Sequence, residues 1–248
     1  MALYGQGGKR WALTERGREH VQRDASTLTI GPSALGWDGD ALTVRIDEVT
    51  APLPARIRGT VRLLPGAPSN RAFELDAKGQ HRWWPIAPRA RVEVALDKPA
   101  VRWSGPAYFD TNSGAVPLER SFVEWDWSRA PLRKGAAVLY EVARRDGSSR
   151  AIAIRIDPHG SVEDFEAPPR VRLPATRWRL GRATRADPSH PVRVEQTLED
   201  APFYARSVLA THLRGEPATA VHESLSLDRF RAPWVQLMVP FRNPRALR

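Results

Sequence analysis

Hydrophobic and polar residues alternate along much of this chain. The alternation is clearest at 42–47, 91–94 and 152–157, where every second side chain is aliphatic and those between are mostly polar. Because successive side chains of a strand point to opposite faces, this pattern predicts strands with one buried and one solvated face. Further strands, separated by Gly, Pro, Asp and Ser clusters, are predicted at 56–64, 136–144, 170–181, 191–198, 203–212, 219–227 and 235–241.

Helical periodicity is scarce by comparison. The 22 prolines and 17 glycines would interrupt most long helices. Many short strands at this spacing are typical of sandwiches and barrels. We therefore predict an all-β fold of the β-barrel or β-sandwich type, with little helix.

The length of 248 residues fits one large all-β domain or two small ones. Pro, Gly and acidic residues gather at 158–170, between two strand-rich stretches. We place a domain boundary there, with a first β domain over 1–160 and a second over 161–248. The chain begins in a predicted strand at 2–4, which leaves open whether a further segment precedes it.

The composition excludes several kinds of site. The chain has no cysteine, which rules out disulfides, thiolate zinc sites, iron–sulfur clusters and a cysteine nucleophile. Its six histidines are scattered, without a His-x-x-x-His pair or a carboxylate cluster, so we predict no metal. There is no apolar run of about 18 residues and no apolar signal-peptide core, so we expect neither a membrane span nor export.

The net charge of +10 changes this picture only in part. Arginines alternate with apolar residues, as at 57–62, and no compact Lys/Arg run is present, so we expect no nucleic-acid partner. From residue 167 onward, the chain contains 14 Arg and 7 Asp or Glu. This excess suits attraction to an anionic membrane surface, and equally an arginine-rich solvated surface.

Aromatic residues concentrate in the segment 79–131, which holds five of the nine tryptophans. Such clustering is compatible with ordinary core packing, and also with an aromatic-walled tunnel for an extended ligand. Residues two apart in a strand share a face. Three pairs are placed together in this way: His81 with Trp83, Tyr108 with Asp110, and Trp125 with Trp127.

The residues alone leave the roles of this segment open. Asp110 opens Asp-Thr-Asn-Ser-Gly, which suits an acid in an aromatic pocket and also a hairpin end, with an Asx-turn and positive φ at Gly114. A lone histidine such as His81 is more often a hydrogen-bonded structural residue than a catalyst. Trp83 by itself suits a core position.

Longer motifs give a more specific indication. Tyr-Phe-Asp-Thr-Asn at 108–112 is followed by Pro-Leu-Glu and Trp-Asp-Trp-Ser-Arg, and further runs stand at 2–17, 30–39, 46–63, 81–94 and 232–245. Over most of its length the chain resembles the carotenoid 1,2-hydratases. That family usually has an N-terminal stretch ahead of the strand at 2–4, and many members have Gly where Pro106-Ala107 stands here.

The resemblance implies two lipocalin-like β domains and cofactor-independent hydration of the terminal C1–C2 double bond of acyclic carotenoids such as lycopene or neurosporene. It implies that Asp110 is the acid and that His81, Trp83 and Tyr108 are its companions in the site. The substrate contacts expected around them are Trp84, Phe109, Asn112, Trp125 and Trp127.

Hydration of an alkene needs a proton donor and stabilisation of the cation that follows. We expect a protonated Asp110 to protonate C2, Trp83 and Tyr108 to face the cation at C1, and His81 to position the attacking water. The alternatives are a polyene binder without turnover, and a related isomerase or pericyclase. A lipid-dissolved substrate implies a cytoplasmic protein attached peripherally to the inner, photosynthetic membrane; the sequence holds no signal for an oligomeric state.

Overall fold

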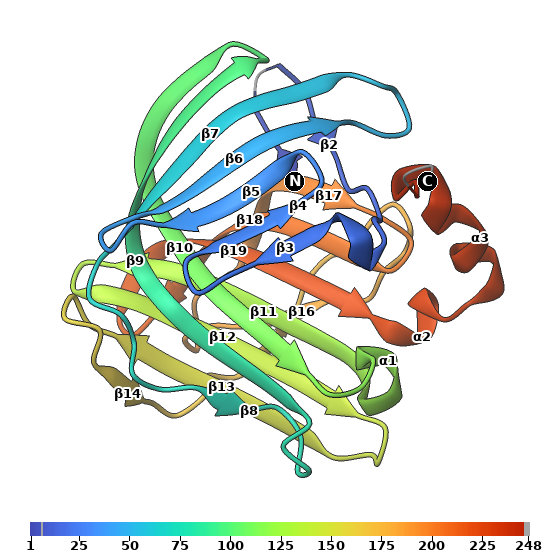
Figure 1. Ribbon diagram of the computed structural model, residues 1–248. Coiled ribbons are helices and arrows are strands. Elements are labelled where there is room, and N and C mark those ends of the chain that lie inside the picture. The colour runs from blue at the N-terminus through green and yellow to red at the C-terminus, as the bar shows by residue number, and fades with distance from the viewer. Residues whose placement is uncertain (6, 246–248) are drawn as a thin grey trace. The chain divides into compact units, whose positions relative to one another are not determined.

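The computed structural model describes residues 1–5 and 7–245, and the chain forms two compact units (Figure 1). The first unit comprises 1–66, 89–108 and the residues from 236 onward, and the second comprises 67–88 and 109–235. Strands make up 56% of the structure and helices 9%, which confirms the prediction of an all-β fold with little helix.

The first unit is built on an antiparallel meander. Its sheet has the strand order β10-β9-β7-β6-β5-β4-β3. Aliphatic residues from one side of these strands, including Ile46, Ile57 and Val94, form its core. The elements are β1 (Ala2–Leu3), β2 (Arg10–Trp11), a 3₁₀ helix (Arg18–His20), β3 (Val21–Arg23), β4 (Thr27–Ile30), β5 (Ser33–Trp37), β6 (Leu42–Val49), β7 (Arg56–Pro65), β9 (His81–Lys98) and β10 (Val101–Gly114).

Two of these strands are long, and the chain passes through them from one unit to the other. The first half of β9, up to residue 88, and the last six residues of β10, 109–114, belong to the second unit. β8 (Phe73–Glu74) pairs with β9 there, with Phe73 opposite Trp83. The second unit therefore contains most of the predicted site residues, including His81, Trp83 and Asp110, whereas Tyr108 lies in the first.

The second unit contains an antiparallel sheet with the order β14-β13-β12-β11-β19-β18-β17 and a separate β15–β16 pair (Figure 1). Aromatic and aliphatic residues cover one face of the sheet, and smaller apolar residues with polar groups cover the other. The strands are β11 (Phe122–Leu132), β12 (Gly135–Arg144), β13 (Ser149–Ile156), β14 (Val162–Asp164), β15 (Arg170–Arg172), β16 (Ala183–Arg185), β17 (Arg193–Asp200), β18 (Tyr204–Leu213) and β19 (Glu216–Ser226).

The expected division at residue 160 falls inside this sheet. Ile156 of β13 pairs with Val162 of β14, and β11–β13 share the sheet with β17–β19. The start of the Pro, Gly and acidic cluster forms a tight turn, in which Asp157 Oδ1 accepts hydrogen bonds from the backbone N–H groups of His159 and Ser161. A turn and a linker share the same composition, so the cluster marks a hairpin, and the compact units divide the chain elsewhere.

Two strand predictions differ from the structure. Of 170–181, only β15 is a strand. The stretch predicted as a strand at 235–241 lies in the helix α3 (Pro233–Arg242), which follows α1 (Leu118–Ser121) and α2 (Leu227–Phe230). A short apolar run fits a strand or a helix equally well. The proline at the first helical position of α3 favours the helix, because it leaves no backbone N–H to satisfy there.

Candidate active site

Asp110 and Trp83 form the central pair of the candidate site. Asp110 lies within β10, and its Oδ2 accepts a hydrogen bond of 2.8 Å from the indole Nε1–H of Trp83. Trp83 is fully buried, at 0% exposure, on β9. The strand position excludes the Asx-turn interpretation of Asp110, and Gly114 does not have the positive φ that such a hairpin end would need.

An aromatic cluster surrounds this pair. The ring of Phe73 lies 5.3 Å from that of Trp83, and Tyr140 of β12 meets Trp83 edge-on, also at 5.3 Å between centroids. Trp125 of β11 in turn meets Tyr140 edge-on at 5.8 Å. These edge-to-face contacts are the arrangement that aromatic quadrupoles favour. They hold the indole of Trp83, and through it the carboxyl of Asp110, in one orientation.

Tyr140 connects the pair to the sheet behind it. It stands directly opposite Trp127 of β11, which stands opposite Glu223 of β19, so the three side chains share one face. Burial raises the pKa of the Tyr140 hydroxyl, and the charges of Asp110 and Glu223 raise it further. The phenol therefore stays protonated at physiological pH.

A part-buried ion pair extends the row beyond Trp127. Arg206 of β18 donates to Glu223 Oε1 at 2.6 Å and to the hydroxyl of Tyr204 at 3.0 Å. Burial raises the pKa of Tyr204, with a further contribution from Glu223. Two carboxylates therefore lie along the aromatic face. Asp110 accepts from the neutral indole of Trp83, and Glu223 accepts from the guanidinium of Arg206.

His81 lies on the same face of β9 as Trp83 and is 2% exposed. Its Nε2 is 2.9 Å from the hydroxyl oxygen of Ser121, and its ring packs against Phe122 at 4.9 Å. A Cβ added to Gly114 would lie 2.6 Å from the Nδ1 of His81. The glycine is therefore needed for the close approach of β10 to the imidazole, and not for an unusual backbone conformation.

The remaining predicted residues divide by strand face. Trp125 and Trp127 join the aromatic cluster, as their alternation predicts. Trp84 lies on the opposite face of β9 from Trp83, where its indole donates to the carbonyl oxygen of Ser69 at 2.9 Å.

Along β10, alternation places Tyr108 and Asn112 on the face of Asp110, and Phe109 on the other face. Asn112 is exposed, and Tyr108 and Phe109 are half-buried. Tyr108 belongs to the first unit.

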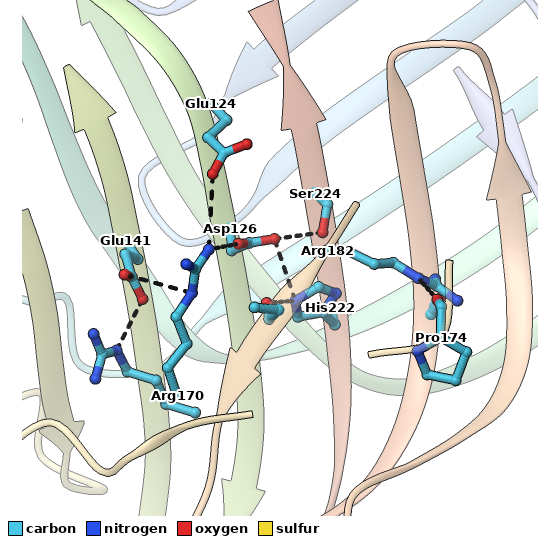
Figure 2. Close-up of polar contacts among 11 residues, drawn as sticks. Glu124, Asp126, Glu141, Arg170, Pro174, Arg182, His222 and Ser224 are labelled. Atoms are coloured by element: carbon cyan, nitrogen blue, oxygen red, sulfur yellow. Dashed lines mark hydrogen bonds and ion pairs between the residues drawn. The ribbon is translucent and has the colours of Figure 1, made fainter. Parts of the chain in front are cut away.

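The opposite face of the β11–β19 sheet carries a different cluster, drawn in Figure 2. Asp126, between the two tryptophans of β11, accepts a hydrogen bond from the hydroxyl of Ser224 and lies 3.6 Å from the guanidinium of Arg170. His222 Nε2 is 3.8 Å from Asp126 and 2.8 Å from the carbonyl oxygen of Ala183. The network joins the sheet to the β15–β16 pair.

Burial governs the titration of this cluster. It raises the pKa of Asp126 from 3.8 to about 6, against the opposing effects of the Ser224 hydrogen bond and Arg170. It lowers the pKa of His222 from 6.5 to about 4. His222 is therefore neutral at physiological pH, and because a carbonyl only accepts, its Nε2 carries the proton that it donates to Ala183.

Comparison with known proteins identifies the family. The family model described as carotenoid hydratase CrtC matches residues 1–248. The chain belongs to the carotenoid hydratase family. Among curated carotenoid hydratases, it is 55% identical to the acyclic carotenoid 1,2-hydratase of Thiocapsa roseopersicina and 52% identical to that of Rubrivivax gelatinosus, in each case over 99% of this chain.

These carotenoid hydratases are longer than the chain. The chain spans 61% of the length of each of the two relatives. It also matches the acyclic carotenoid 1,2-hydratase of Cereibacter sphaeroides, at 39% identity over 99% of this chain and 88% of that relative.

Two solved structures resemble this member of the carotenoid hydratase family in fold. They are an AttH protein from Nitrosomonas europaea, with a TM-score of 0.55 at 16% identity, and CghA determined with Sch210972, with a TM-score of 0.51 at 13% identity. The first match covers 85% of this chain and 72% of the other, and the second covers 83% and 69%. They confirm the prediction of a lipocalin-like all-β fold.

Several residues around the pair were not predicted from the sequence of this carotenoid hydratase. They are Tyr140, Phe73 and Ser121. Tyr140 on β12 and Phe73 on β8 lie outside the quoted motifs, whereas Ser121 stands between the Pro-Leu-Glu and Trp-Asp-Trp-Ser-Arg motifs. Alternation along β12 could have indicated that Tyr140 is buried, but not that it packs on Trp83. Within 1–5 and 7–245, no group of three or more His, Asp or Glu is arranged to hold a metal ion.

Proposed function

We propose that this chain adds water across the terminal C1–C2 double bond of an acyclic carotenoid, such as lycopene or neurosporene. The single observation that carries the proposal is the Asp110 carboxyl, oriented by the buried indole of Trp83 inside an aromatic cluster. Membership of the carotenoid hydratase family supports the choice of reaction and substrate.

Asp110 would supply the proton. Since the indole N–H donates to Oδ2, a protonated Asp110 would carry its acidic hydrogen on Oδ1 and could still accept from Trp83. Transfer of that proton to C2 leaves a tertiary cation at C1 and a carboxylate on Asp110. Water then forms the C–O bond at C1, and its released proton restores the acid. The balance requires only the alkene and one water.

The geometry supports a positioning role for Trp83. Its side chain is fully buried, with Phe73 and Tyr140 packed against its ring. We therefore assign it to hold Asp110 rather than to present a π face to the cation. The half-buried Tyr108 and Trp125 are the aromatic candidates for stabilising positive charge at C1. His81, hydrogen-bonded to Ser121, would orient the attacking water through this polar pair.

The substrate also bears on location. Acyclic carotenoids dissolve in lipid and not in water, so an enzyme acting on them would work at a membrane surface. We propose a cytoplasmic protein associated peripherally with the inner, photosynthetic membrane. Within the residues that the structure describes, no helix is long and apolar enough to cross a bilayer.

The test is incubation of purified protein with lycopene in oxygen-18 water, followed by mass analysis of the pigment, with Asp110→Asn alongside. Gain of one labelled water that disappears in the variant is the expected result. Lycopene that is bound but unchanged would contradict turnover and favour a polyene carrier. A rearranged product without labelled oxygen would favour an isomerase or pericyclase.

A further inference from the structure

The helix α3 carries an exposed apolar face. Leu237 and Phe241 are 74% and 72% exposed, and Trp234 and Met238 are also exposed. Their spacing of three, four and seven residues places all four on one side of the helix. Val235 is buried at 1% exposure and anchors the helix from another side. Large apolar side chains grouped in this way mark an interaction surface more often than they mark chance exposure.

The loop between β15 and β16, residues 173–182, is called the Trp178 loop and extends this apolar surface. The ring of Trp178 stacks on that of Trp234, with 6.1 Å between centroids and an interplanar angle of 25°. Arg229 fixes the loop by donating to the carbonyl oxygens of Trp178 at 2.6 Å and Arg179 at 2.7 Å. The two exposed indoles are thus held together by a defined set of contacts.

The segment that contains α3 carries charges of one sign. The segment 229–245 contains four arginines and no acidic residue, and Arg177 and Arg179 flank Trp178. Arg231, Arg177 and Arg179 are exposed. Arg242 packs over the ring of Trp11, and the exposed Arg245 pairs with the carboxylate of Glu15. The cations that remain at the surface would be attracted by anionic headgroups.

We infer that α3 and the Trp178 loop bind the surface of an anionic lipid bilayer, with Trp234, Leu237, Met238 and Phe241 inserted at the headgroup boundary. Aromatic and aliphatic residues on one side of a helix, with exposed arginines near it, are features of interfacial helices. The ten residues of α3 are too few to span a bilayer, so the helix would lie in the plane of the interface. The inference deepens the proposed function by naming the element that would deliver the enzyme to its substrate.

Binding is tested without carotenoid, so that failure here is distinguishable from failure of the proposed reaction. The full chain is floated with phosphatidylcholine vesicles, with and without phosphatidylglycerol. We expect the double variant Leu237→Glu/Phe241→Glu to bind at least about tenfold more weakly. The matched control is Leu53→Glu, at a residue 82% exposed in another part of the chain, which should bind as the parent does.

Two further measurements separate the apolar and charged contributions. Arg231→Gln should weaken binding to anionic vesicles by about fivefold and leave binding to neutral vesicles unchanged. Because the chain has no cysteine, Leu237→Cys provides a single thiol for an environment-sensitive dye. Its emission should shift to the blue on anionic vesicles, whereas a dye at Leu53→Cys should not respond.

The inference also predicts how turnover depends on the form in which lycopene is supplied. The double variant should hydrate detergent-dispersed lycopene at the parental rate and lose activity on lycopene delivered in vesicles. Vesicle binding equal to that of the parent would overturn the inference. A second result would also overturn it: the parent fails to float with vesicles and sediments as a dimer, and the double variant sediments as a monomer. The face would then be an interface between two copies.

Discussion

Two part-buried aspartates meet opposite faces of the β11–β12–β19 sheet and have different surroundings. Asp110 lies on β10 and meets the aromatic face through Trp83, and Asp126 lies on β11 itself. On the aromatic face, Asp110 accepts from the neutral indole of Trp83 among Phe73, Tyr140 and Trp125. On the other face, Asp126 lies among Ser224, Arg170 and His222. The first arrangement orients the carboxyl by a neutral donor beside aromatic rings, which suits a proton donor. The second surrounds it with groups that hold strands together.

Burial alone therefore does not identify the catalytic carboxyl. Asp126 has a pKa raised to about 6, a feature that often accompanies catalytic acids. Its neighbours are nonetheless tied to backbone and side-chain partners, with His222 on Ala183 and Arg170 shared among Glu124, Asp126 and Glu141. What separates the two is the chemistry of the surroundings, which is an aromatic cluster beside Asp110 and a network of ion pairs and hydrogen bonds around Asp126.

The sharpest test of this comparison exchanges each aspartate for asparagine. Asp110→Asn keeps an acceptor for the Trp83 indole and removes the acidic proton, so we expect the rate of hydration to fall by about 10³-fold. The Asp126→Asn variant should keep most of the activity. Rates come from label incorporation, with circular dichroism as the check on folding. Equal loss of activity in both variants would contradict the assignment of Asp110 as the acid.

The pH dependence of stability distinguishes the two faces next. The pKa of Asp126 in the folded protein, about 6, lies above its ordinary value of 3.8. The stability that this shift contributes is therefore full below pH 3.8 and is lost as the pH rises through 6. The pKa of His222 in the folded protein, about 4, lies below its ordinary value of 6.5. The stability that this shift contributes is therefore full above pH 6.5 and is lost as the pH falls through 4. Between pH 4 and 6 the two effects oppose each other.

Asp126→Asn removes one of these effects. On acidification from pH 6.5 to 4, the variant should lose stability relative to the parent by on the order of 3 kcal/mol, because only the His222 contribution remains. Urea unfolding across this range measures the difference. Parallel stability curves for parent and variant would show that Asp126 is not titrating in the folded protein as the burial of its carboxyl implies.

Trp83→Phe separates orientation from packing on the aromatic face. The change retains a ring and removes the N–H that donates to Asp110, which should lower stability by about 1–3 kcal/mol and reduce turnover. Trp84→Phe is the matched control, since it removes an equivalent indole hydrogen bond, to Ser69, on the other face of β9. Unfolding and kcat are measured for both. Similar loss of kcat in the two variants would argue against a positioning role for Trp83.

The smallest expected effect concerns the approach of β10 to His81. The methyl group in Gly114→Ala would meet the buried imidazole at 2.6 Å and displace it, at a cost of about 1–3 kcal/mol in stability. Gly105→Ala is the control, because its Cβ would meet only the side chain of Trp103, at an ordinary 3.5 Å. Thermal unfolding and the pH profile of turnover should change in the first variant alone.

Particular residues show how far sequence reasoning reached. The face shared by His81 and Trp83, and that shared by Trp125 and Trp127, followed from alternation and are present in the structure. The resemblance of the 108–112 motif to carotenoid hydratases indicated Asp110 as a site residue, whereas physical reasoning from the residues also allowed a turn. The apolar run in α3 fits a strand as well as a helix, because its length does not distinguish the two periods.

The all-β class, the family and the strand faces follow from the sequence alone, because these depend on residue order within one segment. The contacts of the folded chain are needed to show that Trp83 donates to Asp110, that Tyr140 supports the indole, and that Asp126 belongs to a separate network. Those contacts join strands that are remote in sequence, and their register is set by how the whole sheet pairs. The alternation within one strand predicts the face on which a side chain lies. The pairing of strands across the sheet determines which other side chains it contacts.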